Sequence, residues 1–287
     1  MPTGPVLVVG AAGKTGRAVC GALLSRGAAV RAAVRPGREP SAPAGTEPVA
    51  VDLTDGRGLD AALQGCAAAY HLAPNVHPDE VGIAERVGDA ARRTGLRHLV
   101  FHSVLHPDDV RMPHHLRKGV AERALRHRVP GSLVVLRPSA YHENLLPQVL
   151  DGAVALPYSA DTPFTTVALA DVAEVAATAL LDPARDGEVH DLVGPEALTT
   201  REMVGRAEQV LGRPVRLTVG TPGAWAAGPG AGLPASATEA LAAMFAAYDE
   251  DGLVGDPAAL TALLGRRPTS WAETLAAAGT ASALPPS

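Results

Sequence analysis

The chain is poor in several residues on which whole classes of protein depend. Its 287 residues include two cysteines, Cys20 and Cys66, both in apolar surroundings, so we expect buried free thiols rather than a disulfide framework. Aromatic residues make up 3% of the sequence, which predicts aliphatic walls for any binding pocket. No apolar run approaches the roughly 18 residues of a membrane span, and no basic segment followed by an apolar one opens the chain. These absences predict a cytoplasmic protein that does not bind membranes.

Positive charge is also in short supply. The net charge is −5, which argues against nucleic-acid binding. The spacing of the ten histidines matches no common metal-ligand pattern, and no cluster of cysteines or carboxylates accompanies them. We therefore expect no metal site, and a small molecule as the substrate. The sequence leaves open whether the chain forms a homodimer.

A glycine-rich turn between a strand and a helix is the most informative feature that is present. A short apolar strand pattern passes directly into G-x-x-G-x-x-G at Gly10, Gly13 and Gly16, and an apolar helix pattern follows. The glycines let the turn tighten and let backbone amides approach a pyrophosphate at the positive end of the helix dipole. Residues 13–15 also resemble the end of a P-loop, but that motif needs glycine where this chain has Val8. The turn therefore predicts a dinucleotide rather than ATP or GTP.

Strand-like and helix-like segments alternate through the first half of the chain. The expected strands are 6–9, 29–34, 48–51, 68–72, 99–102 and 133–136, and the expected helices are 16–25, 59–64, 81–94 and 114–126. Strands separated by helices form right-handed parallel crossovers. The pattern predicts an α/β fold with a Rossmann-type doubly wound parallel sheet, and we assign residues 1–145 to an NAD(P)-binding domain.

The second half of the chain has a different character. We expect residues 146–287 to form a smaller, partly interleaved substrate-binding lobe. Asp171 is the expected N-cap of a helix over 172–181, and a strand is expected at 189–193.

Later in this half, capping residues and a glycine-rich stretch mark further boundaries. Thr199 and Glu202 form the expected capping box of a helix that ends before Gly212. The stretch 220–236, rich in glycine, proline and alanine, is expected to be a loop or lid. Residues 256–257, Asp-Pro, are the expected N-cap and first turn of a late helix.

The end of the second expected strand distinguishes between the two nicotinamide cofactors. In NAD sites an acid about 20 residues after the glycines binds the ribose hydroxyls, but this strand ends at Arg35 and no acid follows before Glu39. The planar fork of an arginine suits a 2′-phosphate, and Lys14 adds positive charge in the turn. NADP(H) is therefore expected over NAD(H). Asp52, after the third strand, is expected at the adenine pocket, although a simple turn residue explains it nearly as well.

Several segments, in their order and spacing, resemble one family. They are Gly10-x-x-Gly13-x-x-Gly16, Val30-x-x-x-x-Arg35-Pro36, Leu96–Ser103, Lys118-x-x-x-Glu122, Leu136–Asn144, Asp171–Ala173, Gly194–Thr199 and Gly265–Thr269. Together they resemble the atypical short-chain dehydrogenase/reductase superfamily, within its NmrA-like group of isoflavone-reductase-like and quinone-reductase-like enzymes. The likeness covers almost the whole chain and is weakest between 215 and 250.

The resemblance implies a set of site residues. The cofactor contacts that it implies are Gly10, Ala12, Gly13, Lys14, Thr15, Gly16, Arg35, Asp52, Leu53, Ala73, Pro74 and Lys118. The substrate contacts that we expect are Leu105, Tyr141, His142 and Asn144.

The resemblance also implies a catalytic set, from which this chain departs at one position. Typical members use Tyr-x-x-x-Lys and a serine on the preceding strand, and Lys118 and Ser103 stand at the matching places. The tyrosine position is His114, which lies at the expected start of a helix, where the dipole disfavours an imidazolium. A neutral His114 can donate a hydrogen bond to a carbonyl but is a weak acid, and a plain surface residue is the alternative. By resemblance, Lys118 holds the nicotinamide ribose.

These observations predict an NADPH-dependent oxidoreductase. It would transfer hydride to a small apolar electrophile such as a quinone, an enone, a carbonyl or an imine. Two alternatives stay open: a non-catalytic NADP(H) sensor that binds a protein partner, and a cofactor-dependent isomerase or cyclase in a biosynthetic pathway. A sensor would have to bind one redox form of the cofactor better than the other.

Overall fold

The computed structural model describes residues 4–182 and 185–282. Its contacts group the chain into two compact units. Unit 1 holds the chain up to Asp108, with His115–Arg137 and Val172–His190, and unit 2 holds Asp109–His114, Pro138–Asp171 and the chain from Asp191 onward. The units thus interleave along the chain, while the domain division at residue 145 stays a prediction.

Unit 1 is built on a seven-stranded sheet in the order β3-β2-β1-β4-β5-β6-β9. The strands are β1 (Val6–Val9), β2 (Val30–Val34), β3 (Glu47–Ala50), β4 (Ala68–His71), β5 (His98–His102), β6 (Ser132–Pro138) and β9 (Val189–Leu192). Every pairing among β1 to β6 is parallel. Strands such as β1 and β4 are apolar and buried on both faces, as parallel sheets require. The predicted Rossmann-type α/β fold is therefore confirmed.

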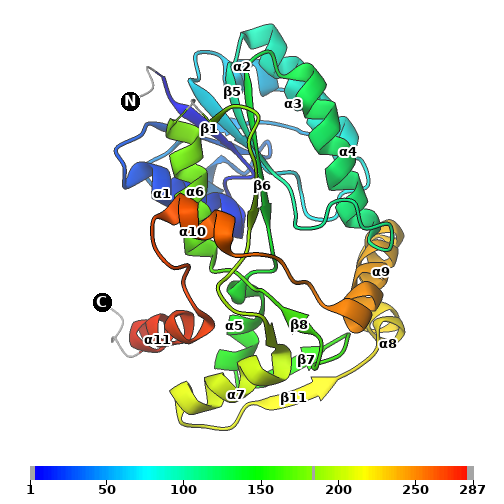
Figure 1. Cartoon of the computed structure of the whole chain (residues 1–287). Helices are drawn as coiled ribbons and strands as arrows, with labels where there is room; N and C mark the ends of the chain where they lie inside the picture. The colour runs from blue at the N-terminus through cyan, green and yellow to red at the C-terminus, as the bar shows by residue number, and fades with distance from the viewer. Residues whose placement is uncertain (1–3, 183–184, 283–287) are drawn as a thin grey trace. The chain divides into compact units, whose positions relative to one another are not determined.

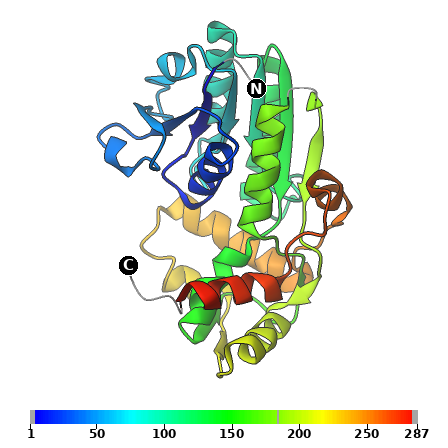
Figure 2. The ribbon, with the colours of Figure 1, turned by 90° about the vertical axis from the view of Figure 1, so that its left-hand side faces the viewer.

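Helices cover both faces of this sheet (Figure 1). They are α1 (Lys14–Leu24), α2 (Leu59–Leu63), α3 (Glu80–Thr94), α4 (Pro113–Arg128) and α6 (Leu169–Leu181), with a short 3-10 turn η1 (Glu39–Ser41) after β2. One face packs its apolar side chains, such as Leu7, Leu99 and Phe101, against α2, α3 and α4. Helices α1 and α6 lie on the opposite face, which Figure 2 shows from the front. This arrangement brings the carboxyl ends of β1, β2, β4 and β5 to one edge.

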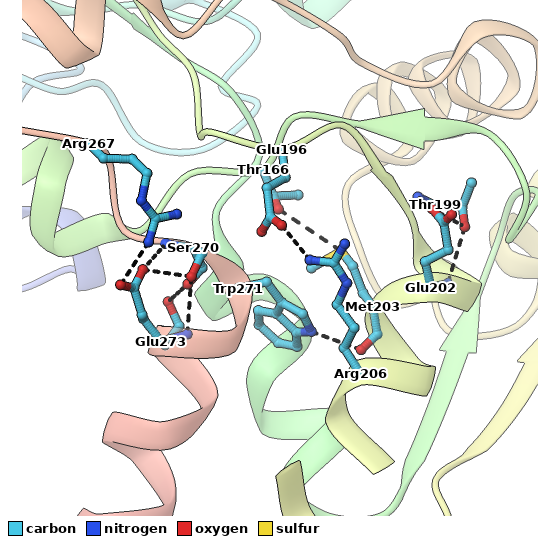
Figure 3. Close-up of polar contacts among 11 residues, drawn as sticks. Thr166, Glu196, Thr199, Glu202, Met203, Arg206, Arg267, Ser270, Trp271 and Glu273 are labelled. Carbon is cyan, nitrogen blue, oxygen red and sulfur yellow. Dashed lines mark hydrogen bonds and ion pairs between the residues drawn. The ribbon is translucent and has the colours of Figure 1, made fainter. Parts of the chain in front are cut away.

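Unit 2 combines helices with two small two-stranded sheets. Its elements are α5 (His142–Leu150), β7 (Ala153–Leu156), β8 (Pro163–Phe164), β10 (Leu198–Thr199), α7 (Thr200–Leu211), β11 (Arg216–Val219), α8 (Pro222–Ala227), α9 (Ala235–Asp251), α10 (Ala258–Leu264) and α11 (Trp271–Ser282). Strand β7 pairs with β11 in parallel, and β8 pairs with β10 antiparallel. Trp271 is buried at the centre, and its indole Nε1 donates to the carbonyl of Met203 over 2.8 Å (Figure 3).

The capping box predicted at Thr199 and Glu202 is confirmed. The Thr199 hydroxyl accepts the backbone N–H of Glu202, and the Glu202 carboxylate accepts that of Thr199 over 2.8 Å (Figure 3). Helix α7 ends at Gly212, whose φ of 65° lies in the left-handed region that glycine favours.

Three boundary predictions in this half are wrong. Asp171 is not an N-cap, because α6 begins two residues earlier; instead the carboxylate of Glu143 accepts the backbone N–H of Leu169 at the helix start. Residues 220–236 are not a loop, since α8 and the start of α9 lie there, and the Thr221 hydroxyl caps α8. At the late helix α10 the N-cap is Pro257 rather than the aspartate before it.

No helix among the described residues is long and apolar enough to cross a membrane.

Candidate cofactor-binding and active site

The glycine turn at the end of β1 is built around contacts that exclude side chains. Gly10 has a φ of +77°, a conformation that other residues rarely adopt, and its carbonyl accepts the N–H of Gly13 over 3.0 Å. A Cβ on Gly16 would lie 2.2 Å from the Gly10 carbonyl oxygen and 2.7 Å from the Cα of Ala11. Helix α1 therefore packs directly on the turn, which is the close approach that the glycine spacing predicts.

The N-terminus of α1 points its first N–H groups toward this turn without a capping side chain. The residue before the helix is Gly13, and no acidic residue lies in the first turn. Arg17 of α1 stabilises the turn. Its guanidinium donates to the carbonyl of Ala12 over 2.9 Å and to the carbonyl of Ser41 over 2.7 Å. A helix start without a side-chain cap, at the positive end of the helix dipole, favours the binding of an anion. Lys14 is exposed and Thr15 buried in the same first turn.

Two exposed arginines follow β2. Arg35 and Arg38 belong to a tight turn in which the N–H of Arg38 donates to the Arg35 carbonyl over 2.9 Å and Gly37 takes a φ of +77°. Within residues 4–182 and 185–282, neither guanidinium takes part in a hydrogen bond or ion pair. The two forks are thus available to an anion at the end of β2, where the predicted 2′-phosphate would lie.

The predicted contacts after β3 are engaged within the chain. The Asp52 carboxylate accepts the backbone N–H and the hydroxyl of Thr54, over 2.9 and 2.6 Å, and these bonds hold its pKa below the usual range. The carbonyl of Leu53 accepts from the Nε of Arg86 over 2.9 Å. Asp52 is therefore at least a turn residue, and its adenine contact stays a prediction.

The loop after β4 carries Ala73 and Pro74 to the same edge of the sheet. Ala73 is buried and Pro74 is exposed. Two residues further on, Val76 has a φ of +52°, which a β-branched side chain strongly disfavours. Strained residues of this kind cluster at ligand-binding loops, and the strain here lies beside both predicted contacts.

Lys118 extends from α4 to the end of β5 and is almost completely buried. Its ammonium pairs with Glu80 of α3 over 2.5 Å and donates to the backbone carbonyl of His102 over 3.2 Å. It also lies 5.5 Å from the centre of the Phe101 ring. An ammonium group has three N–H donors, and the described part of the chain supplies these two acceptors, so one donor is left for a ligand.

The hydroxyl of Ser103 already donates a hydrogen bond within unit 1. It donates to the carboxylate of Glu122, which also receives two bonds from the guanidinium of Arg137, over 2.9 and 2.6 Å. A hydroxyl has one hydrogen, so Ser103 keeps only its lone pairs for a ligand and can act there as an acceptor. Neither Glu122 nor Arg137 was predicted from the sequence as a site residue. Glu122 had a signal, because it lies four residues after Lys118 on the same helix.

Two buried histidines lie beside Lys118. His71 stacks on Phe101 at 5.4 Å between ring centres, and neither of its ring nitrogens has a hydrogen-bond partner in the part of the chain that the structure describes. The Nδ1 of His102 shares a hydrogen bond with the hydroxyl of Tyr70. Burial, aided by the charge of Lys118, lowers the pKa of each histidine to about 3, so both rings are neutral. No group of three or more His, Cys, Asp or Glu among the described residues could hold a metal ion.

His114 lies in the first turn of α4, four residues before Lys118. This spacing puts the two side chains on one face of the helix, and His114 is buried. The neighbouring His115 is fully buried, and its Nδ1 is 2.8 Å from the carbonyl oxygen of Leu105. The chemical role of His114 stays a prediction.

The expected substrate contacts divide into accessible and buried residues. Tyr141 is the N-cap of α5, and its carbonyl accepts the N–H of Asn144 over 3.1 Å; Tyr141 is partly exposed and Asn144 is exposed. His142 is 1% exposed, with its Nδ1 2.7 Å from the Thr274 hydroxyl and its ring edge-on to Trp271. Leu105 is completely buried. The substrate contacts at all four residues stay predictions.

The late motifs in unit 2 are bound to one another. The Asp171 carboxylate, 1% exposed, accepts the N–H of Thr269 over 2.6 Å and pairs with Arg266 over 2.8 Å. Figure 3 shows the neighbouring pairs of Glu196 with Arg206 and of Arg267 with Glu273. The sequence motifs around Asp171 and Arg266 therefore meet in space as a structural network.

Comparisons with known proteins agree with this fold. The model of the NmrA-like family matches residues 2–275. A (4-alkanoyl-5-oxo-2,5-dihydrofuran-3-yl)methyl phosphate reductase from Streptomyces griseus is 34% identical over 218 residues, covering 74% of this chain and 75% of the relative. An NAD(P)H azoreductase from Xenophilus azovorans is 28% identical over 279 residues, covering 93% and 96%. A quinone oxidoreductase from Escherichia coli, solved with NADPH, shares the fold with a TM-score of 0.81 at 23% identity, covering 96% and 99%.

Proposed function

The chain belongs to the NmrA-like family, and from this premise we propose that it is an NADPH-dependent oxidoreductase that transfers hydride to a small apolar electrophile. Quinones, enones, carbonyls and imines are the acceptor classes. The observation that carries the proposal is the combination of a helix N-terminus that has no side-chain cap, beside the Gly10–Gly16 turn, with two arginines after β2 that have no partner among the described residues.

The residues present fit NADP(H). The tight packing of Gly16 against Gly10 leaves a turn lined by backbone, which is what a pyrophosphate needs for close approach. Arg35 and Arg38 supply forks for a 2′-phosphate, and Lys14 adds charge at the helix start. An acid that would favour the ribose hydroxyls of NAD is absent from the end of β2, where Arg35 stands.

The chain's own residues have separate tasks in this proposal. Lys118 holds the nicotinamide ribose through its remaining N–H, and Ser103 accepts a hydrogen bond. The bound cofactor supplies the hydride. No strong protein acid is required for a quinone, because water can protonate the reduced oxygen. The replacement of the family's tyrosine by His114 is compatible with such an acceptor.

The names of the relatives support the reaction class rather than one substrate. The furanone phosphate reductase and the azoreductase both act as reductases, on chemically different acceptors. We extend to this chain only what they share, reduction at the expense of a nicotinamide cofactor. A cytoplasmic location and a homodimer belong to the same proposal, and cell fractionation and the mass in solution test them.

The oxidation of NADPH, followed by its absorbance, tests the function directly. A panel of quinones, azo compounds, butenolides, aldehydes and imines is offered with NADPH and, separately, with NADH. We expect turnover with one or more of these classes and a lower Kd for NADPH than for NADH. Tight NADPH binding without turnover on any class would reject the oxidoreductase, and a large difference between the affinities for NADP⁺ and NADPH would then favour a sensor.

A further inference from the structure

Helices α3 and α4 are joined by two ion pairs of very different burial. Glu80 and Lys118 pair over 2.5 Å with side chains 0% and 7% exposed. Ten residues after Lys118 on α4, the guanidinium of Arg128 pairs with Glu85 of α3 over 2.8 Å, and these side chains are 28% and 41% exposed. The same two helices thus provide a buried pair at the sheet edge and a matched, solvent-screened pair further away.

A buried ion pair at this place is not explained by stability. Removing two charges from water costs several kcal/mol for each ion, and well-packed apolar residues of similar volume are often as stable. Long basic side chains usually extend to solvent instead. We therefore expect the buried Glu80–Lys118 pair to have a role other than stabilising the fold.

The residue type at position 118 is also unusual for this chain. The chain has 25 basic residues, but Lys14 and Lys118 are its only lysines, and both stand at predicted cofactor contacts. An ammonium is a compact charge with three donors that point in different directions, whereas a guanidinium is a planar fork. At position 118 one donor meets Glu80 and a second meets the His102 carbonyl.

These contacts fix the direction of the third donor. Glu80 approaches the ammonium from α3, and the His102 carbonyl approaches it from the end of β5. The rings nearby add no competing charge, because His71 and His102 are neutral. We propose that Glu80 is a positioning residue that orients the Lys118 ammonium toward the ribose of the bound cofactor. The inference rests on the proposed function, because it names the residue that makes the ribose contact of Lys118 possible.

Cofactor binding, which needs no turnover, tests the proposal. The Kd of NADPH is measured by fluorescence for the wild type, Glu80→Gln, Lys118→Met and the double variant. We expect Glu80→Gln and Lys118→Met each to weaken binding about tenfold, and the double variant to bind like Lys118→Met alone, since Glu80 acts through the lysine. Glu85→Gln, at the exposed pair, is the matched control and leaves the Kd within about twofold.

Several results would overturn the proposal. If Glu80→Gln binds NADPH as tightly as the wild type, Glu80 is not a positioning residue. The same conclusion follows if the loss of affinity in Glu80→Gln simply adds to that in Lys118→Met. If the wild type itself fails to bind NADPH, the proposed function has failed instead. The double variant lacks both charges and so avoids an unpaired buried ion, which keeps the comparison with Lys118→Met measurable if Glu80→Gln folds poorly.

Lysine labelling gives a second readout, which a purely structural role of Glu80 would not change. In a Lys14→Arg background Lys118 is the one lysine, so amine labelling read by peptide mass spectrometry reports on it alone. We expect Glu80→Gln to raise the labelling rate severalfold and NADPH to suppress labelling only when Glu80 is present. Equal protection by NADPH with and without Glu80, in proteins with the same thermal unfolding, would contradict the inference.

Discussion

Four arginines of unit 2 and two arginines at the end of β2 in unit 1 are used in opposite ways. In unit 2, Arg201, Arg206, Arg266 and Arg267 each pair with a carboxylate of the same unit. At the end of β2 in unit 1, Arg35 and Arg38 have no partner among the described residues. Both groups stand in or near segments that carry the family resemblance, and the sequence predicted a cofactor contact only at Arg35. The pairing separates them: arginines bound to acids stabilise the fold, and unpaired arginines are available to a ligand.

Buried histidines sharpen the comparison and give the largest expected effect. Burial lowers the pKa of His71 and His102 in unit 1 to about 3 and that of His142 in unit 2 to about 4. The unfolded chain binds these protons near pH 6.5, so between about pH 6.5 and 3 protons favour the unfolded state. The free energy of unfolding should therefore be nearly constant between about pH 7 and 8 and fall as the pH is lowered, by about 2 kcal/mol for each of the two unit 1 histidines at pH 5.

Urea unfolding between pH 8 and pH 5 measures this dependence. The variant His71→Leu should have a shallower slope, because one proton-binding group is removed and an unpartnered buried ring is replaced by an apolar side chain. The same substitution at the exposed His127 serves as the control. A slope that His71→Leu leaves unchanged would show that His71 is not buried in its neutral form.

The structural network of unit 2 predicts the next largest effect. Asp171→Ala removes the partner of Arg266 and of the Thr269 N–H, and we expect a loss of about 3 kcal/mol in the free energy of unfolding. Asp161→Ala, at an exposed pair with Arg201, should cost under about 1 kcal/mol. The Kd of NADPH, measured where each variant is folded, should stay within twofold. A selective loss of NADPH binding in Asp171→Ala would break the division between structural and ligand-binding motifs.

The unpaired arginines predict a smaller effect, on binding alone. Arg35→Ala combined with Arg38→Ala should weaken NADPH by about 2 kcal/mol, or roughly 30-fold, and leave NADH unchanged, because only NADPH has the 2′-phosphate. Arg267→Ala, in the pair with Glu273, is the control and should alter neither Kd. Competition binding with both cofactors measures the difference. Equal losses for NADPH and NADH would place the two arginines elsewhere on the cofactor.

The first half of the fold could be predicted from the sequence because its signals are local. Apolar strands alternate with helices, and Gly10 and Gly95 mark turns that need a left-handed backbone. Unit 2 gave fewer signals. Alanine-rich α9 has little contrast between its faces, and strands as short as β8 and β10 carry no period at all. The loop expected over 220–236 shows how a composition rich in glycine and proline hides a short helix.

At the site, the sequence indicated the residues that face a ligand better than those that hold them. Lys118 was named from its motif, but Glu80 was not, because an acid at the start of a helix is usually read as a response to the helix dipole. Glu143 was missed as the cap of α6 for a related reason, since it reaches Leu169 from a remote part of the chain. Such partners depend on tertiary packing, which no local pattern records.

The capping box of α7 gives the smallest expected effect and tests unit 2 at a site remote from any proposed ligand. Thr199→Ala removes the hydroxyl that accepts the Glu202 N–H, and we expect a loss of about 1 kcal/mol in the free energy of unfolding. Thr199→Asp keeps an acceptor at the N-cap and should recover most of this loss, because a carboxylate also interacts favourably with the helix dipole. Urea unfolding of the three proteins measures the difference. If alanine and aspartate prove equally destabilising, the hydroxyl bond does not stabilise α7, and the helix depends instead on the burial of Met203 and Val204 against Trp271.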